Sequence, residues 1–173
     1  MTDEGEFPKS DGDILYDGDV NDYLLNKIAI APYTGTGFNS TKTNQGNDEQ
    51  DHELTAITDG ISGKTYAVIE ITGYSKAVDV SSSASYVQLK IQTKDVGGSY
   101  SDSMSYKTII YTLDNSNVDV RTTQTVKWVH TLTADEKTNG IQVKVFSKSI
   151  VGAASASASA SFTNIQTVLK LSN

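Results

Sequence analysis

Between residues 65 and 149 the sequence contains five runs in which apolar and polar side chains alternate with a period of two. Within residues 86–93, for example, Val87, Leu89 and Ile91 alternate with glutamine and lysine. Alternation with one polar face is typical of an antiparallel sheet that covers a core with one side only. The same pattern defines five runs: Thr65–Thr72, Tyr86–Thr93, Ser105–Leu113, Thr125–Thr133 and Ile141–Ser149.

Turn-forming residues separate these runs. They are Asp59-Gly60, Gly97-Gly98, Asp114–Asn117 and Asn139-Gly140. Several short strands with turn signals at fairly regular spacing, and no long helical run, indicate a two-sheet structure. We therefore expect an all-β chain that forms an antiparallel β-sandwich of jelly-roll type, preceded by a short N-terminal helical docking segment.

The end of the chain carries an unusual run in which alanine and serine alternate from Ala154 to Ser161. The pattern predicts a strand whose apolar side is made of methyl groups alone. Such a strand fits a narrow place in the core under Trp128 or a tyrosine, or a contact between subunits near a symmetry axis. Ile165, Leu169 and Leu171 fall on the opposite parity, which predicts a bulge or turn near Thr163-Asn164.

Three zones follow from these patterns: an anchoring segment at 1–38, a polar linker or loop at 39–53, and a sandwich domain at 54–173. The linker is inferred because residues 39–53 contain no apolar side chain. In the first zone Asp19 can cap a short helix that places Val20, Leu24, Leu25 and Ile28 on one face. A helix this short must dock, either on its own domain, on another protein or on copies of itself.

Composition excludes several classes of function. The absence of cysteine removes disulfides, cysteine-ligated metals and thiol catalysis. A net charge of −7, with 14 basic residues scattered among 21 acidic ones, disfavours binding to nucleic acid and to anionic membranes. No apolar run is long enough for a membrane span, so no membrane insertion is expected, and the acidic N-terminus is unlike a signal peptide.

The residues that carry chemistry are few. His130 shares its parity with Trp128 and Leu132, so we interpret it as a hydrogen-bonded, partly buried strand residue rather than a catalyst. His52 lies close to Asp48, Asp51 and Glu53, a set that could hold a cation but is more typical of a solvated loop. Asp17, Asp19 and Asn21 match the start of a calcium loop, whose required glycine and final glutamate are missing. We predict no catalytic residue, no metal and no cofactor.

Tyrosine is the residue type best suited to surface recognition here. Its ring offers amphipathic contact area to a sugar or a protein. Several of the nine tyrosines, such as Tyr66, Tyr86 and Tyr106, open strands, where strand propensity explains them, but Tyr74 and Tyr100 lie in or beside predicted loops. These two are the candidate surface-binding residues.

The segment Asp11–Asp22, which reads DGDILYDGDVND, resembles a segment near the N-terminus of many tailed-phage tail-fibre and other virion proteins. In that family an Asp-Gly-Asp and an apolar pair precede a helix start, followed by a linker and a β-sandwich head that is often trimeric. The head domain of this chain matches no family by sequence pattern.

The resemblance implies a location in the virion and attachment to other virion proteins through Val20, Leu24, Leu25 and Ile28. It also implies a homo-oligomer, a trimer, whose head binds a host surface glycan or protein. The alternative is a stand-alone carbohydrate-binding or adhesion module. A third hypothesis, a depolymerase using Asp48, Asp51 or Glu53, lacks a recognisable carboxylate motif, so we expect no enzymatic activity.

Overall fold

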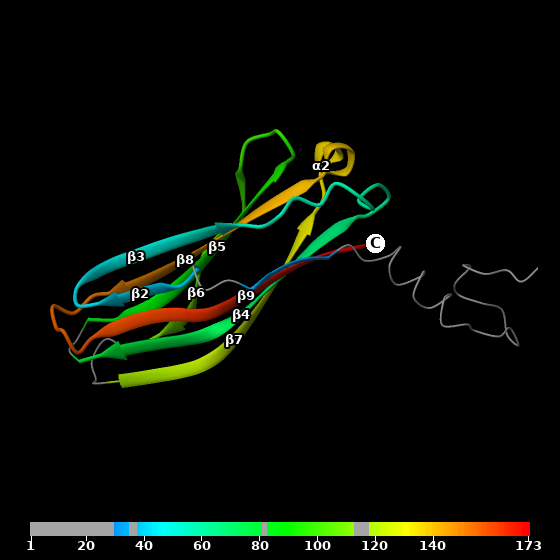
Figure 1. Cartoon of the computed structure of the whole chain (residues 1–173). Coiled ribbons are helices and arrows are strands. Elements are labelled where there is room, and N and C mark those ends of the chain that lie inside the picture. Colours follow the sequence, from blue (N-terminus) through cyan, green and yellow to red (C-terminus); the bar gives the residue numbers. More distant parts are fainter. Residues whose placement is uncertain (1–29, 35–37, 81–82, 113–117) are drawn as a thin grey trace, which may run out of the picture.

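The computed structural model describes residues 30–34, 38–80, 83–112 and 118–173, which form nine strands and one short helix (Figure 1). The elements are β1 (Ile30–Thr34), β2 (Ser40–Thr43), β3 (Gly46–Glu53), β4 (Tyr66–Asp79), β5 (Ser85–Asp95), β6 (Ser101–Tyr111), β7 (Val118–Thr131), α2 (Ala134–Asn139), β8 (Ile141–Val151) and β9 (Ser159–Ser172). The chain is all-β, as the alternation predicts. No helix in the described part is long and apolar enough to cross a membrane.

The strands make two antiparallel sheets that pack face to face. One has the order β1-β9-β4-β7, with β2 also paired to β9, and the other has the order β3-β8-β5-β6. The pairing is nested, since β5 pairs with β6, β4 with β7, β3 with β8 and β2 with β9. A long hairpin that is folded over on itself in this way is a jelly roll. The predicted jelly-roll sandwich is confirmed.

The core lies between the sheets and is built from alternate residues of the central strands. Val87, Leu89 and Ile91 of β5 are fully buried, as are Ile69 and Ile71 of β4, which matches the parities expected from the sequence. Since each of these side chains faces apolar neighbours across the sandwich, burial contributes about 1.5–3 kcal/mol per residue.

The polar stretch at 39–53 is a correction to the sequence-based interpretation. It forms strands β2 and β3, which pair with β9 and β8, instead of a linker or loop. An edge strand pairs on one side only, so backbone hydrogen bonds can hold it in a sheet without an apolar stripe. Phe38 and Leu54, which flank the stretch, are both buried. The sandwich therefore includes residues expected in the linker and in the anchoring segment.

The alanine–serine run is a second correction. Residues 152–158 form turns, closed by hydrogen bonds from Ser155 N to Ala153 O and from Ala158 N to Ser155 O, and β9 starts only at Ser159. Ala158 and Ala160 are buried, whereas Ala156 is exposed. Short methyl groups give an isolated strand little burial energy, so the first half of the run turns instead.

The predicted bulge near Thr163-Asn164 is confirmed. The register between β4 and β9 shifts between Thr72 and Tyr74, and Asn164 adopts a φ of 53°. The residues of β9 that point into the core have even numbers up to Phe162, before the bulge. They have odd numbers from Ile165 onward, after it. The predicted helix and its docking residues Val20, Leu24, Leu25 and Ile28 lie outside the described residues.

Candidate functional site

The outer face of the sheet β3-β8-β5-β6 gathers charged and aromatic side chains in rows. Directly opposite residues of an antiparallel pair point to the same side of the sheet. The register therefore places Glu49 beside Lys148, and Glu53 beside Lys144. We call this surface the lysine–tyrosine face; its residues are Glu49, Asp51 and Glu53 of β3, Lys144, Phe146 and Lys148 of β8, Lys90 and Lys94 of β5, and Tyr100 and Tyr106 at β6.

Aromatic rings on this face are in contact with lysine ammonium groups. The Nζ atom of Lys90 lies 4.0 Å from the ring centroid of Phe146 and 5.1 Å from that of Tyr106. Tyr100 has two such neighbours, with Lys94 at 4.7 Å and Lys144 at 4.8 Å. Cation–π contacts at these distances contribute about 0.5–1 kcal/mol each at exposed sites. The rings are therefore held in fixed positions on the sheet.

Carboxylates of β3 balance the lysines. Lys148 lies 3.0 Å from Glu49, and Lys144 lies 3.5 Å from Glu53. The neighbouring hydroxyl of Tyr106 holds the pKa of Glu49 below its usual value, and the hydroxyl of Tyr100 does the same for Glu53. Burial, followed by the neighbouring glutamates, raises the pKa of both tyrosines. Both phenols are therefore neutral at physiological pH.

These contacts limit what the face can recognise. Each lysine named above lies over an aromatic ring, and two of them also pair with carboxylates, so no unpaired cluster of positive charge is presented to a phosphate. Fixed aromatic rings beside polar groups suit an uncharged polar ligand, such as a saccharide, or a protein surface. Tyr100 belongs to this face. Tyr74 is exposed on β4 of the other sheet, so the two predicted surface residues do not form one site.

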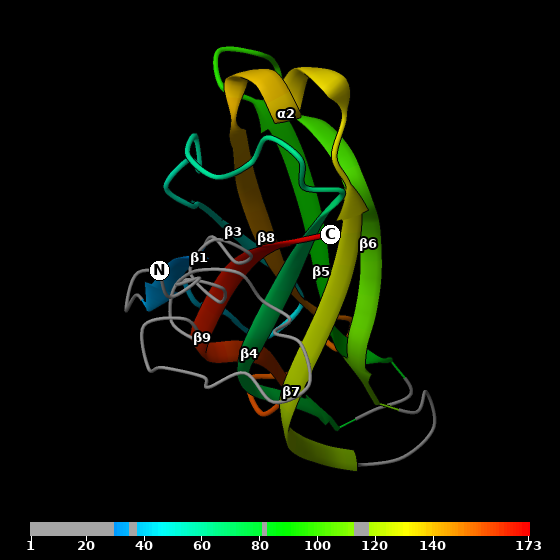
Figure 2. The same cartoon turned by 90° about the vertical axis from the view of Figure 1, so that its right-hand side faces the viewer.

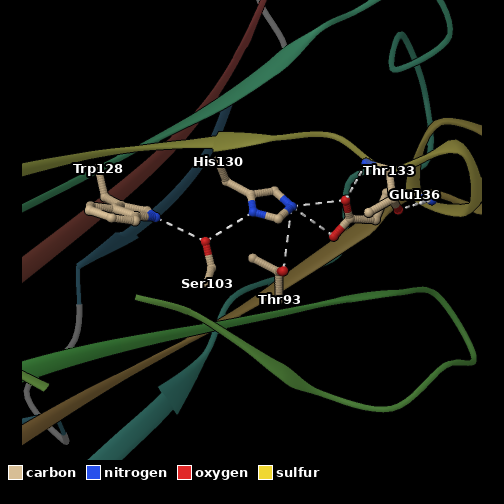
Figure 3. A network of polar contacts seen from close by, with 6 residues as sticks. All are labelled: Thr93, Ser103, Trp128, His130, Thr133 and Glu136. Atoms are coloured by element: carbon tan, nitrogen blue, oxygen red, sulfur yellow. Dashed lines mark hydrogen bonds and ion pairs between the residues drawn. The ribbon is translucent and has the colours of Figure 1, made fainter. Parts of the chain in front are cut away.

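A second polar cluster surrounds His130 on the side where edge strands β6 and β7 face each other (Figures 2 and 3). Nε1 of Trp128 donates to Ser103 Oγ at 2.9 Å, and Ser103 Oγ lies 2.9 Å from Nδ1 of His130. Nε2 of His130 lies 2.9 Å from Glu136 Oε2. Glu136 also accepts from the backbone N–H of Thr133 at 2.8 Å, which closes the capping box of α2.

This order of serine, histidine and carboxylate resembles the residues of a hydrolase triad, but the hydrogen bonds describe a structural network. The Glu136 carboxylate can only accept, so Nε2–H of His130 donates to it, and Nδ1 of the neutral ring accepts from the Ser103 hydroxyl, whose oxygen accepts from the indole N–H. Every polar atom of His130 thus has a partner, and the network ties β6, β7 and α2 together. The placement agrees with the partly buried, hydrogen-bonded residue expected at this position.

Burial raises the pKa of Glu136, but the hydrogen bonds from His130 and Thr133 outweigh it and leave that pKa below its usual value.

The residues weighed as a cation site do not converge. His52 and Asp51 are neighbours in β3, and neighbours in a strand point to opposite faces. Asp48 accepts hydrogen bonds from Thr41 N and from Gln50. The His52 ring lies 6.1 Å from that of Phe38, and burial lowers its pKa. Among the described residues, no group of three or more His, Asp or Glu side chains is placed to hold a metal ion.

Sequence reasoning missed most of these residues. The motif Thr133-Ala-Asp-Glu136 has the spacing of a capping box and could have revealed Glu136. The lysine–tyrosine face could not be found in the same way, because its rows depend on which strands are neighbours.

By its own strand order the molecule belongs to the class of jelly-roll β-sandwiches. No protein-family model and no curated protein sequence matches the chain. Among solved structures, it is similar to that of infectious bursal disease virus Gt strain, with a TM-score of 0.48 and 12% identity over 84% of this chain and 33% of that chain. The Gx strain gives a TM-score of 0.45, 10% identity, and 84% and 32% coverage.

A third similar structure is the CBM22-1 xylan-binding domain of Paenibacillus barcinonensis Xyn10C. Its TM-score is 0.28, with 16% identity over 82% of this chain and 92% of that chain. The chain spans about a third of the length of the viral chains it matches. None of these similarities assigns a function.

Proposed function

We propose that the chain is a structural component of a virus particle, a fibre-like appendage or a capsid or tail decoration. The observation that carries this proposal is the nested pairing of β2 to β9, which makes an eight-stranded jelly roll. Virion proteins and lectins are two main users of this architecture. The interior is filled by residues such as Leu89, Ile91 and Val143, which supports a packed scaffold.

The N-terminal segment supplies the attachment in this proposal. The resemblance of residues 11–22 to the attachment region of tail-fibre proteins supports it, with Val20, Leu24, Leu25 and Ile28 as the docking side chains. Copies of the chain associate as a trimer, and the sandwich faces outward, where it binds a host surface glycan or protein.

The test is co-purification with particles from the cells that produce the chain. We expect the full chain in the particle band of a density gradient, and we expect the double variant Leu24→Asp/Ile28→Asp to leave that band while its circular dichroism stays β-rich. Val168→Asp, a change on the outer face of β9, is a control that should stay with the particles. A chain that never sediments with particles would contradict the proposal.

The lysine–tyrosine face favours a second candidate function, that of a carbohydrate-binding module. Tyr100, Tyr106 and Phe146 lie on one sheet face with fixed polar neighbours. A glycan array with the full chain tests this, because a fragment starting at residue 54 would lack β2 and β3. Saccharide binding that Tyr100→Ala abolishes and Tyr74→Ala leaves intact would support it, whereas loss with Tyr74→Ala alone would place binding elsewhere.

A further inference from the structure

Strand β7 presents a long edge that has one neighbour among the described strands. It has 14 residues, pairs with β4 alone and keeps one register from Val118 to Thr131. β6, the edge strand of the other sheet, has three register shifts instead. A long edge without bulges is a template for the addition of another strand, whereas bulges discourage such addition.

The backbone groups available on this edge can be assigned. Leu132 N donates to Thr65 O, at the end of the β4–β7 ladder. Residues of an antiparallel ladder alternate between pairs that are hydrogen-bonded and pairs that are not. Even-numbered residues of β7 therefore bond to β4. Odd-numbered residues, from Asp119 to Thr131, direct their N–H and C=O groups away from the sheet. The C=O of Thr123 accepts from Thr122 Oγ1 at 3.2 Å and has a second lone pair for another donor.

We propose that β7 pairs antiparallel with β7 of a second copy of this chain, about a two-fold axis at Thr123. In this register Asp119 lies opposite Lys127 of the second copy, and the symmetry repeats that pair of opposite charges. Within one copy Asp119 lies 2.6 Å from Arg121 and Lys127 lies 3.2 Å from Glu70, but their side chains are 44% and 64% exposed, so each can also reach a charge on a second copy. Thr123 lies opposite its own symmetry mate, and the two sheets join into one.

The charges select this register over its neighbours. A two-fold axis at Gln124 would set Arg121 opposite Lys127 of the second copy, and like charges in that position are destabilising. An axis at Thr125 would set Asp119 opposite a threonine and form no ion pair. The register at Thr123 is the one of these three that matches opposite charges.

The inward side of β7 agrees with the same register. Val120, Val126 and Trp128 pack against the core but stay half-buried, because the sheet ends there. The two-fold axis at Thr123 sets Val120 opposite Val126 of the second copy and Val118 opposite Trp128. Apolar side chains that one copy leaves half-covered would then cover one another.

This inference goes beyond the proposed function and is independent of it. A trimer held by the N-terminal segment uses other residues, so the two contacts can be separated. The edge contact doubles the mass of a monomer, and it doubles the mass of a trimer when its two-fold axes lie perpendicular to the three-fold axis.

The test is light scattering after size exclusion, with the full chain at several concentrations. Thr123→Pro removes an outward N–H at the axis, and proline is tolerated on the open side of an edge strand. Thr131→Pro is the matched control, since its N–H also points outward but lies beyond the paired residues 118–128. We expect Thr123→Pro to halve the mass that the wild type and Thr131→Pro share.

A charge exchange tests the register without proline. Asp119→Lys and Lys127→Asp each set like charges opposite one another twice, and each should raise the dissociation constant roughly tenfold. The double variant Asp119→Lys/Lys127→Asp should restore wild-type association. If Thr123→Pro has the same mass as the wild type, the edge contact is overturned, and the proposed trimer is not affected. If the double variant associates no better than the single variants, the register is overturned.

Discussion

A Cβ atom on Gly73 would stand 2.6 Å from Cζ of Phe162. It would also lie 3.1 Å from the backbone oxygen of Thr163. Gly73 belongs to β4 at the bulge, where the register of β9 shifts, and Phe162 is fully buried there. The phenyl ring thus fills the space above a residue without a side chain, and this contact fixes the point at which the inward parity of β9 changes.

We therefore expect Gly73→Ala to destabilise the protein by about 1–3 kcal/mol, because the added methyl must displace a ring in a packed core. Urea unfolding followed by circular dichroism measures this. The double variant Gly73→Ala/Phe162→Leu should lose less than the sum of the two single losses, because the smaller side chain makes room for the methyl. Strict additivity would show that the two residues are not in contact.

Glu136→Ala should cost about 2 kcal/mol at pH 7. It removes the acceptor for both His130 and the backbone N–H of Thr133. The folded-state pKa of Glu136 lies below its ordinary value of 4.5. The contribution is therefore fully present above pH 4.5 and is lost as the pH falls through the lowered pKa.

The difference in unfolding free energy between wild type and Glu136→Ala should accordingly shrink below pH 4.5, in urea titrations at a series of pH values. Asp135→Ala is the control, since Asp135 is exposed in the same first turn of α2. A constant difference from pH 7 to pH 3 would contradict the assigned role of the carboxylate.

Ser103→Ala should be clearly destabilising, by about 1–3 kcal/mol, because it leaves the indole N–H of Trp128 without its acceptor and Nδ1 of His130 without its donor. Trp128 is the single tryptophan, so its fluorescence reports both the local change and the unfolding transition. Ser101→Ala, on the exposed start of the same strand, should stay within about 0.5 kcal/mol of the wild type. Equal effects of the two changes would argue against the network.

The sequence predicts the central strands well and the edges poorly, for one physical reason. β4, β5 and β8 have neighbours on both sides and cover the core, so the middle of each strand places apolar residues inward, as Val87, Leu89 and Ile91 do in β5. β3 is an edge, and its inward positions include Asp48 and His52, which hides the alternation. In β6 the register shifts, and Ile110 is buried while Tyr111 is exposed.

The candidate site also has one part that local sequence predicts and another part that depends on strand pairing. Tyr100 could be chosen from the sequence because its residue type and loop position suffice. Its neighbours Lys94 and Lys144 come from β5 and β8, which are brought together by a crossover between distant strands. No local sequence pattern encodes that pairing, so the side-chain rows of the lysine–tyrosine face can be placed only once the strand register is known.

Tyr106→Phe should raise the pKa of Glu49 towards the ordinary value for glutamate. The hydroxyl of Tyr106 is the largest influence that lowers this pKa, and phenylalanine removes the hydroxyl while it keeps the ring beneath Lys90. NMR titration of the glutamate side-chain carboxyl carbons measures the change. Tyr100→Phe serves as the reciprocal variant, because Tyr100 lowers the pKa of Glu53 instead. Each variant should therefore move one carboxylate and leave the other in place, and a Glu49 pKa that Tyr106→Phe does not change would show that the face is not ordered by its tyrosine hydroxyls.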